Sequence, residues 1–227
     1  MNERFLYVSD IFCPWCYGFA PVLHRLLERF GFPADVLCGN LVEEPTLASS
    51  MNSPRTLAFF ERLQQTTGRR IGSGFFELLK SNAVMDSALS CRLLCALRRL
   101  APGRSLEQLE AFQNAFYGGG MDVLSAEVQY RIAGAWGVDA ADLEAAMRSE
   151  VVIRDAQREM ADAEEALGDF VVYPTLFVRS GNGELHAAAR GYASFEKVEA
   201  AVAQIVAGCG ADAGGPLHAC GLDGVCH

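Results

Sequence analysis

The stretch that decides the fold is Asp10–Gly18, DIFCPWCYG, in which two cysteines stand with only two residues between them. A short run of β-forming residues, Phe5–Val8, precedes it, and an apolar helical stripe follows it up to Phe30. Gly31 ends this predicted helix, and Ala34–Gly39 is a second short apolar run. The order strand, helix, strand predicts a βαβ unit with parallel strands, and it places both cysteines at the turn into the helix.

The position of the two cysteines predicts redox chemistry. Unpaired N–H groups and the positive end of the dipole at a helix start stabilise a thiolate at Cys13, and pKa values of roughly 3.5–7.5 are typical of such sites. Cys16 lies one turn further along, where it can close a disulfide with Cys13 or expel a mixed disulfide held there. We therefore expect Cys13 to attack and Cys16 to resolve. Half of a zinc site is the alternative reading, but no second Cys-x-x-Cys occurs in the sequence.

The residues around the two cysteines are expected to serve substrate binding and proton transfer. Pro14 suits the first turn of a helix, where its missing N–H costs nothing. We expect Trp15 to face outward as part of a docking surface. Asp10, three residues before Cys13, either tunes the proton transfers of the pair or is an ordinary turn residue.

A second candidate feature is the tripeptide Tyr173-Pro174-Thr175 inside the apolar run Phe170–Val178. Strands tolerate proline only at edges or at their first residue, and an X-Pro bond can be cis. Together with the cysteine pair, the sequence favours a cis bond that leaves the backbone of Tyr173 open to an extended substrate beside Cys13. A trans proline that starts an edge strand is the alternative.

The rest of the chain predicts a mixed α/β sheet interrupted by helices. Strand signals stop after residue 44 and return after residue 168 as a strand, a hairpin and a last helix, Phe195–Val206. We expect a discontinuous α/β domain of residues 1–44 and 168–208, an inserted all-helical domain of residues 45–167, and a tail of residues 209–227.

Composition limits the function classes. The formal net charge of −9, without any basic stripe, argues against nucleic-acid binding, which needs clustered Lys and Arg. No apolar run approaches the length of a membrane span. The N-terminal residues do not follow the pattern of a signal peptide, so we expect a cytoplasmic protein with reduced thiols and no membrane partner.

The remaining cysteines are less informative. Cys38 is expected to be a buried core residue, and Cys91 and Cys95 share a helix face, which indicates packing, with a metal or redox pair as the alternative. The tail could serve an auxiliary redox role, capture a metal or have no defined role. We predict no metal site. The tail residues concerned are Cys209, Cys220, Cys226, His218 and His227.

The motifs CPWC at a helix start and YPT before a terminal hairpin and helix resemble those of the DsbA-like thioredoxin-fold oxidoreductases. The resemblance covers about residues 4–207, and DIFCPWCYGFAP is most similar to the predicted cytoplasmic protein-disulfide isomerases and the FrnE-like branch. It implies a thioredoxin-like fold with a helical insertion, Cys13 as nucleophile, Cys16 as resolving thiol and Pro174 as cis-proline. Pro-Trp replaces the Pro-His of the strong periplasmic oxidant, which argues against strong oxidase activity.

We therefore expect a thiol–disulfide oxidoreductase that reduces or isomerises disulfides in protein or peptide substrates. The redox-active pair Cys13–Cys16 would need no bound cofactor, and the reductant would be glutathione or a thioredoxin system. Two alternatives remain open. One is a glutathione-dependent transferase or isomerase of the kappa or chromene-carboxylate type, and the other is a non-enzymatic metal-binding or redox-sensing protein that uses the tail cysteines.

Overall fold

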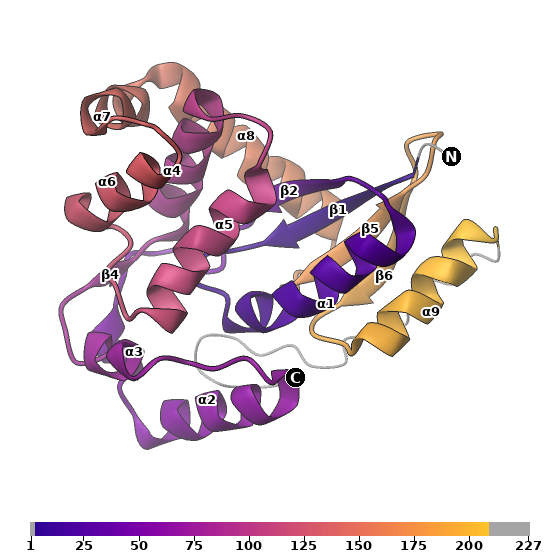
Figure 1. Ribbon diagram of the computed structural model, residues 1–227, viewed down its shortest axis with the longest axis horizontal. Coiled ribbons are helices and arrows are strands. Elements are labelled where there is room, and N and C mark those ends of the chain that lie inside the picture. Colours follow the sequence, from indigo (N-terminus) through magenta and orange to yellow (C-terminus); the bar gives the residue numbers. More distant parts are fainter. Residues whose placement is uncertain (1–2, 209–227) are drawn as a thin grey trace.

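The computed structural model describes residues 3–208, and a four-stranded mixed sheet forms its centre (Figure 1). The strands are β1 (Arg4–Ser9), β2 (Ala34–Cys38), β5 (Thr175–Arg179) and β6 (Leu185–Arg190). They lie in the order β2-β1-β5-β6, with β1 parallel to β2 and with β5 antiparallel to both β1 and β6. The predicted βαβ unit and mixed sheet are confirmed.

Two helices, α1 (Pro14–Phe30) and α9 (Phe195–Val206), cover one face of the sheet (Figure 1). Phe5 and Tyr7 of β1 are buried against this face, and the Tyr7 ring stacks on the Phe19 ring of α1 with 6.0 Å between centroids. Residues on one side of a strand alternate with residues on the other, so only every second side chain of β1 contributes here. This packing fixes the start of α1, and with it the cysteine pair, at one end of the sheet.

The opposite face of the sheet is covered by α8 (Glu150–Leu167). Leu6 and Val8, which alternate with the side chains that face α1, pack there against Ala163 and Leu167. In sequence α8 belongs to the segment between β2 and β5. The helical segment and the sheet therefore share hydrophobic packing, while the domain boundaries at residues 45 and 167 stay a prediction.

The segment between β2 and β5 is mostly helical, but a two-stranded antiparallel ladder interrupts it. The prediction of an all-helical segment is wrong at this ladder, because strands of two residues give no periodic signal in a sequence. Across the described residues, no helix is long and apolar enough to span a membrane. The elements before α8 are β3 (Thr46–Leu47), the 3-10 helix η1 (Ala48–Met51), α2 (Pro54–Thr67), α3 (Ser73–Leu78), β4 (Val84–Met85), α4 (Ser87–Leu100), α5 (Ser105–Gln113), the π-helical turn η2 (Asn114–Gly118), α6 (Ala126–Ala135) and α7 (Ala140–Arg148).

The apolar run Phe170–Val178 is only partly strand. The Tyr173–Pro174 peptide bond is cis, and β5 begins at the next residue, Thr175. Proline has no N–H to give to a sheet ladder, so the strand starts after it. Strand β5 therefore begins five residues later than the apolar run Phe170–Val178 from which the strand was predicted.

Candidate active site

The two cysteines lie at the end of a tight turn that joins β1 to α1. The Cys13 N–H donates to the Asp10 carbonyl at 3.2 Å, which closes the turn. Cys13 is the N-cap of α1, with φ −85° and ψ 109°, and Pro14 is the first residue of the helix. The sequence prediction that the pair stands at a strand-to-helix turn is confirmed.

Within the pair, the Cys16 backbone N–H donates to the Cys13 Sγ at 3.2 Å. Both thiols are free and buried, with exposed fractions of 2% for Cys13 and 0% for Cys16. Burial raises the pKa of the Cys13 thiol well above its usual range, whereas the hydrogen bond from the Cys16 N–H lowers it by less. The direction is opposite to the low pKa expected from the helix start, because burial and the interactions with the Cys16 side chain outweigh the backbone hydrogen bond.

Asp10 is a buried carboxyl group at the start of the same turn. Its Oδ1 accepts from the Phe12 N–H at 2.8 Å, and its Oδ2 accepts from the Leu41 N–H at 3.1 Å. Burial raises the pKa of Asp10 to about 6, although these hydrogen bonds oppose the rise. Asp10 also interacts electrostatically with Cys13. Asp10 therefore has the structural role of a turn residue, while a role in the proton transfers of the cysteine pair stays a prediction.

The sheet register places the cis-proline beside this turn. Thr175 is paired with Val8, so Pro174 follows next to the end of β1, from which the turn departs. Burial raises the pKa of Tyr173 to about 12, and smaller electrostatic contributions come from Asp10, Cys16 and Cys13. Thr175 itself is buried, and its hydroxyl donates to the Val172 carbonyl at 2.7 Å. The structure thus brings Tyr173 and Pro174 to the cysteines, while the Thr175 side chain supports the loop from inside.

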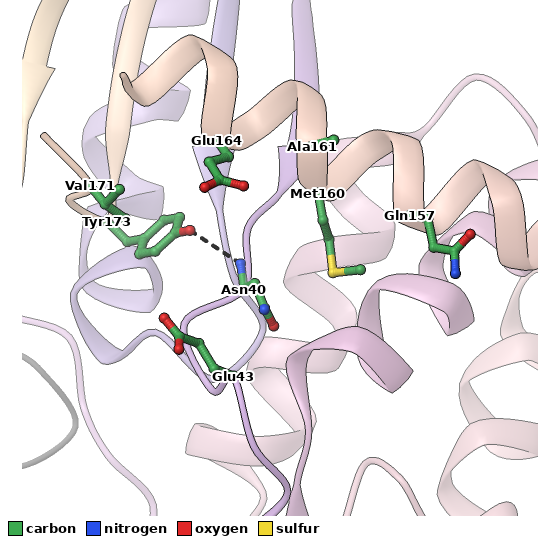
Figure 2. A pocket seen from close by; sticks show the side chains of 8 residues that line it. All are labelled: Asn40, Glu43, Gln157, Met160, Ala161, Glu164, Val171 and Tyr173. Atoms are coloured by element: carbon green, nitrogen blue, oxygen red, sulfur yellow. Dashed lines mark hydrogen bonds between the residues drawn. The ribbon is translucent and has the colours of Figure 1, made fainter. Parts of the chain in front are cut away.

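A pocket of about 460 Å³ opens beside Tyr173 (Figure 2). The Tyr173 hydroxyl accepts from the Asn40 N–H at 3.1 Å, and the ring lies where a Cβ at Gly39 would come within 2.1 Å of it. Two carboxylates, Glu43 and Glu164, lie at its wall. The pocket offers both apolar surface and negative charge next to the candidate site. Its lining residues are Asn40, Glu43, Gln157, Met160, Ala161, Glu164, Val171 and Tyr173.

Side chains from the helical segment hold the turn in place, and the sequence did not point to them. The Gln113 amide donates to the Asp10 carbonyl at 2.9 Å, and the Tyr117 hydroxyl donates to the Phe12 carbonyl at 2.5 Å. The only sequence signal near them is the glycine run that follows Tyr117. These two bonds couple the cysteine turn to α5 and η2.

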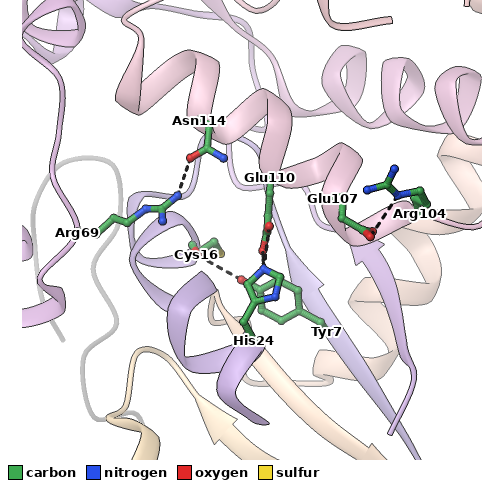
Figure 3. A network of polar contacts seen from close by, with 8 residues as sticks. All are labelled: Tyr7, Cys16, His24, Arg69, Arg104, Glu107, Glu110 and Asn114. Atoms are coloured by element: carbon green, nitrogen blue, oxygen red, sulfur yellow. Dashed lines mark hydrogen bonds and ion pairs between the residues drawn. The ribbon is translucent and has the colours of Figure 1, made fainter. Parts of the chain in front are cut away.

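Polar contacts between α1 and the helical segment reinforce this coupling (Figure 3). His24 of α1 lies 2.8 Å from a carboxylate oxygen of Glu110 on α5, and within the helical segment the Arg69 side chain donates to Asn114 at 2.5 Å. On the sheet side, the Tyr7 hydroxyl donates to the Cys16 carbonyl at 3.3 Å. The sheet therefore holds the first turn of α1 through Tyr7, and α5 holds the middle of the helix through His24.

Trp15 differs from its prediction. It is 1% exposed, and its ring lies 5.9 Å from the Phe59 ring of α2 and 5.6 Å from the Tyr192 ring, centroid to centroid. A large aromatic side chain gains most by leaving water, and α2 supplies an aromatic surface against which it packs. The prediction that Trp15 faces outward is wrong for this structure. Pro14 is buried as well.

The structure describes three of the remaining cysteines and does not describe those of the tail. Cys38 is buried at the end of β2, as predicted, and Cys91 and Cys95 are buried on α4. All three lie around Glu159 of α8, apart from the pair Cys13 and Cys16. The tail residues Cys209, Cys220, Cys226, His218 and His227 lie outside the described residues.

A mixed sheet with a Cys-x-x-Cys pair at the start of its first helix defines the class of thioredoxin-like thiol–disulfide folds. The chain belongs to the family of DsbA-like thioredoxin domains, whose profile matches residues 6–203. Both the predicted family and the predicted fold are confirmed. The search of curated protein sequences returned no match.

Solved structures with the same fold span most of the chain. A Nitrosomonas europaea protein assigned as a protein disulfide isomerase matches with a TM-score of 0.72 at 20% identity, over 92% of this chain and 99% of its own. The cytosolic disulfide reductase DsbM from Pseudomonas aeruginosa matches with a TM-score of 0.65 at 23% identity, over 81% and 88%. A 2-hydroxychromene-2-carboxylate isomerase matches with a TM-score of 0.55 at 15% identity, over 91% and 96%. At these identities the likeness shows the fold alone.

Proposed function

We propose that this chain is a thiol–disulfide oxidoreductase that reduces or isomerises disulfides in protein or peptide substrates. The observation that carries the proposal is the free pair Cys13 and Cys16 at the start of α1, in a turn that lies beside Tyr173–Pro174. Family membership supports the oxidoreductase class, and the pair supplies the two thiols that exchange requires. The preference for reduction or isomerisation rests on the Pro-Trp dipeptide between the cysteines.

The proposed reaction has two exchange steps. The Cys13 thiolate attacks one sulfur of the substrate disulfide, a bond forms between the two sulfurs, and the other substrate sulfur leaves as a thiolate. The Cys16 thiolate then attacks the Cys13 sulfur and releases the second substrate thiol. Two electrons and two protons pass to the substrate, and Cys13 and Cys16 end as a disulfide.

The first step requires that the Cys13 thiol lose its proton. Because burial raises the pKa of Cys13, a nearby base assists this loss. Asp10, with a pKa of about 6, is mostly ionised at neutral pH, and although its charge raises the pKa of Cys13, we propose it as the base that accepts the proton. Since Cys13 is only 2% exposed, substrate binding must also uncover it.

The substrate is proposed to lie along Tyr173 and Pro174 and to reach into the pocket beside Tyr173. Glu43 and Glu164 in the pocket wall favour substrate segments with positive charge over anionic ones. Thr175 is proposed to hold this loop, and the backbone of Tyr173 to pair with the substrate.

The cellular setting is proposed to be the cytoplasm, with glutathione or a thioredoxin system as electron donor. DsbM is described as a cytosolic disulfide reductase, and a structure of it with GSH has been solved. Reducing conditions would keep Cys13 and Cys16 as thiols and so favour reduction over net oxidation.

The test compares wild type with Cys13→Ser and Cys16→Ser in insulin reduction and in refolding of a scrambled disulfide protein. We expect Cys13→Ser to lose activity in both assays. Cys16→Ser should accumulate a mixed disulfide on Cys13 that mass spectrometry detects. Ser90→Ala changes a buried residue outside the pair and serves as the control. Full activity of Cys13→Ser in both assays would refute the proposal.

A glutathione-dependent transferase or isomerase is the second candidate. Two similarities of fold support this candidate. One is to 2-hydroxychromene-2-carboxylate isomerase, and the other is to DsbM, which has been solved with GSH. Such an enzyme would bind glutathione near Cys13 and would work without Cys16. Retention of glutathione-dependent turnover in Cys16→Ser, with no trapped mixed disulfide, would favour this candidate over the first.

A further inference from the structure

Three buried cysteines and one carboxylate meet where β2, α4 and α8 come together. Cys38 ends β2, Cys91 and Cys95 lie one turn apart on α4, and Glu159 comes from α8. The Sγ atoms of Cys38 and Cys91 and a carboxylate oxygen of Glu159 all lie within 4.8 Å of one another. The Cys95 Sγ lies 3.3 Å from the Glu159 Oε2. The Sγ atoms of Cys38 and Cys91 and a carboxylate oxygen of Glu159 therefore form a compact group from three elements, and the Cys95 Sγ lies beside Glu159 as a fourth potential ligand.

Glu159 is already oriented toward the cysteines. Its Oε1 accepts from the Cys38 N–H at 2.8 Å and from the Arg98 guanidinium at 2.6 Å. Its Oε2 accepts from the same guanidinium at 2.8 Å and faces Cys95. Hydrogen bonds that fix a carboxylate in this way are typical of the outer contacts around a metal ligand. Arg98 therefore holds both oxygens, and Oε2 also lies next to the Cys95 thiol.

We propose that Cys38, Cys91, Cys95 and Glu159 bind one Zn²⁺ ion. Zinc takes thiolate and carboxylate ligands in a tetrahedral site, with bonds of about 2.3 Å to sulfur and about 2.0–2.2 Å to oxygen. Cuprous ion prefers ligands that are all soft, so the carboxylate favours zinc. The site is separate from Cys13 and Cys16, and it differs from our sequence prediction of no metal.

The binding step is an exchange of protons for metal and changes no oxidation state. Three Zn–S bonds and one Zn–O bond form, and three S–H bonds lose their protons to solvent. Three thiolates, one carboxylate and Zn²⁺ carry a net charge of −2, which the adjacent Arg98 guanidinium reduces to −1.

The position of the cluster allows an ion to enter from the protein surface and lets a bound ion join three elements of the fold. The Arg98 and Glu159 side chains keep 14% and 13% of their surface exposed, so the cluster reaches the protein surface between α4 and α8. Cys38 is paired with Ser9, the residue before Asp10. A bound ion would therefore link the helical segment to the strand next to the catalytic turn.

The test uses a full-length chain in which only the proposed ligands remain as cysteines. This background carries Cys13→Ser, Cys16→Ser, Cys209→Ser, Cys220→Ser and Cys226→Ser. The protein is reduced with a phosphine, stripped with a chelator and titrated with Co²⁺, which reports thiolate ligands through charge-transfer absorption. We expect saturation at about one Co²⁺ per chain, displacement by Zn²⁺, and a higher melting temperature with metal bound.

Further variants in the same background locate the site. Cys91→Ala should abolish the charge-transfer band, and Glu159→Gln should weaken binding by about tenfold or more. Ser90→Ala, at a buried neighbour of Cys91 on α4, is the matched control and should bind as the background does. Glu159→Gln retains every cysteine, so it tests the site even if Cys91→Ala does not fold.

Two results would overturn the proposal. One is a background protein that is folded and reduced, as shown by circular dichroism and thiol titration, yet gives no charge-transfer band. The other is Co²⁺ binding that survives both Cys91→Ala and Glu159→Gln. Neither result bears on the exchange activity of Cys13 and Cys16, so the two proposals fail separately.

Discussion

At Cys13 two influences on one thiol oppose each other. The Cys16 N–H donates to its sulfur and favours the thiolate, while burial at 2% exposure favours the neutral thiol. The sequence places Cys13 at a helix start, and from that position alone a low pKa follows. Burial depends on packing by residues distant in sequence, so its dominance at this thiol appears only in the folded structure.

The raised pKa of Asp10 can be tested through the pH dependence of the unfolding free energy. Its pKa of about 6 in the folded chain lies above the value of an exposed aspartate. The folded state therefore binds more protons than the unfolded state between about pH 4 and 6, and stability falls as pH rises through that window. From pH 4 to pH 7, wild type should lose up to roughly 3 kcal/mol of unfolding free energy relative to Asp10→Asn.

The measurement is urea unfolding of both proteins at several pH values, and only the difference between the two profiles is used. An absolute offset is expected, since the asparagine side chain of the Asp10→Asn variant would have one acceptor oxygen for the two N–H groups that Asp10 binds. Parallel profiles would show that Asp10 titrates as an ordinary exposed carboxyl group.

At the level of the elements, Gly120 allows the loop after η2 to lie close against α3. Gly120 has φ +64°, and a Cβ there would lie 2.0 Å from the Gly74 carbonyl carbon and 2.4 Å from the Phe75 N. We expect Gly120→Ala to push this loop away from α3 and to disturb Tyr117, which holds the catalytic turn. The loss of stability should exceed that of a positive-φ glycine in open space by roughly 2 kcal/mol or more.

Gly137→Ala is the matched control, because Gly137 has φ +75° and no atom within 4 Å of the added Cβ. Its cost should be roughly 1–2 kcal/mol, from the left-handed backbone alone. Chemical denaturation of the two variants measures the difference. Equal losses would mean that the close approach at Gly74 contributes nothing.

The elements also show what sequence can predict. The helix Phe195–Val206 and the strand-to-helix turn at Cys13 were predicted, because caps and apolar periodicity are local signals. The burial of Trp15 was not, since it depends on Phe59 of α2 and on Tyr192. The gathering of Cys38 with Cys91 likewise requires that β2 and α4 meet, which no spacing within one helix reveals.

For the whole molecule, the question is whether the helical segment and the sheet unfold together. α8 buries Ala163 and Leu167 on the sheet, and Gln113 and Tyr117 hydrogen-bond to the cysteine turn. A part that loses its partner here would expose apolar surface and leave buried polar groups unpaired. We therefore expect one cooperative transition for the described chain, although the segment occupies a continuous insertion in the sequence.

The two tryptophans make this testable, because Trp15 of α1 reports the contact between the sheet side and α2, and Trp136 reports the helical segment from the end of α6. Trp136→Phe leaves fluorescence from Trp15, and Trp15→Phe leaves fluorescence from Trp136. Within each variant, the urea midpoint by fluorescence should coincide with the midpoint by far-UV circular dichroism, which follows all helices. Comparing probes inside one variant removes the effect of the substitution on stability. Fluorescence midpoints below the circular dichroism midpoint in both variants would show instead that the helical insertion unfolds first, as an independent domain, because Trp15 would lose its contact with Phe59 in that step.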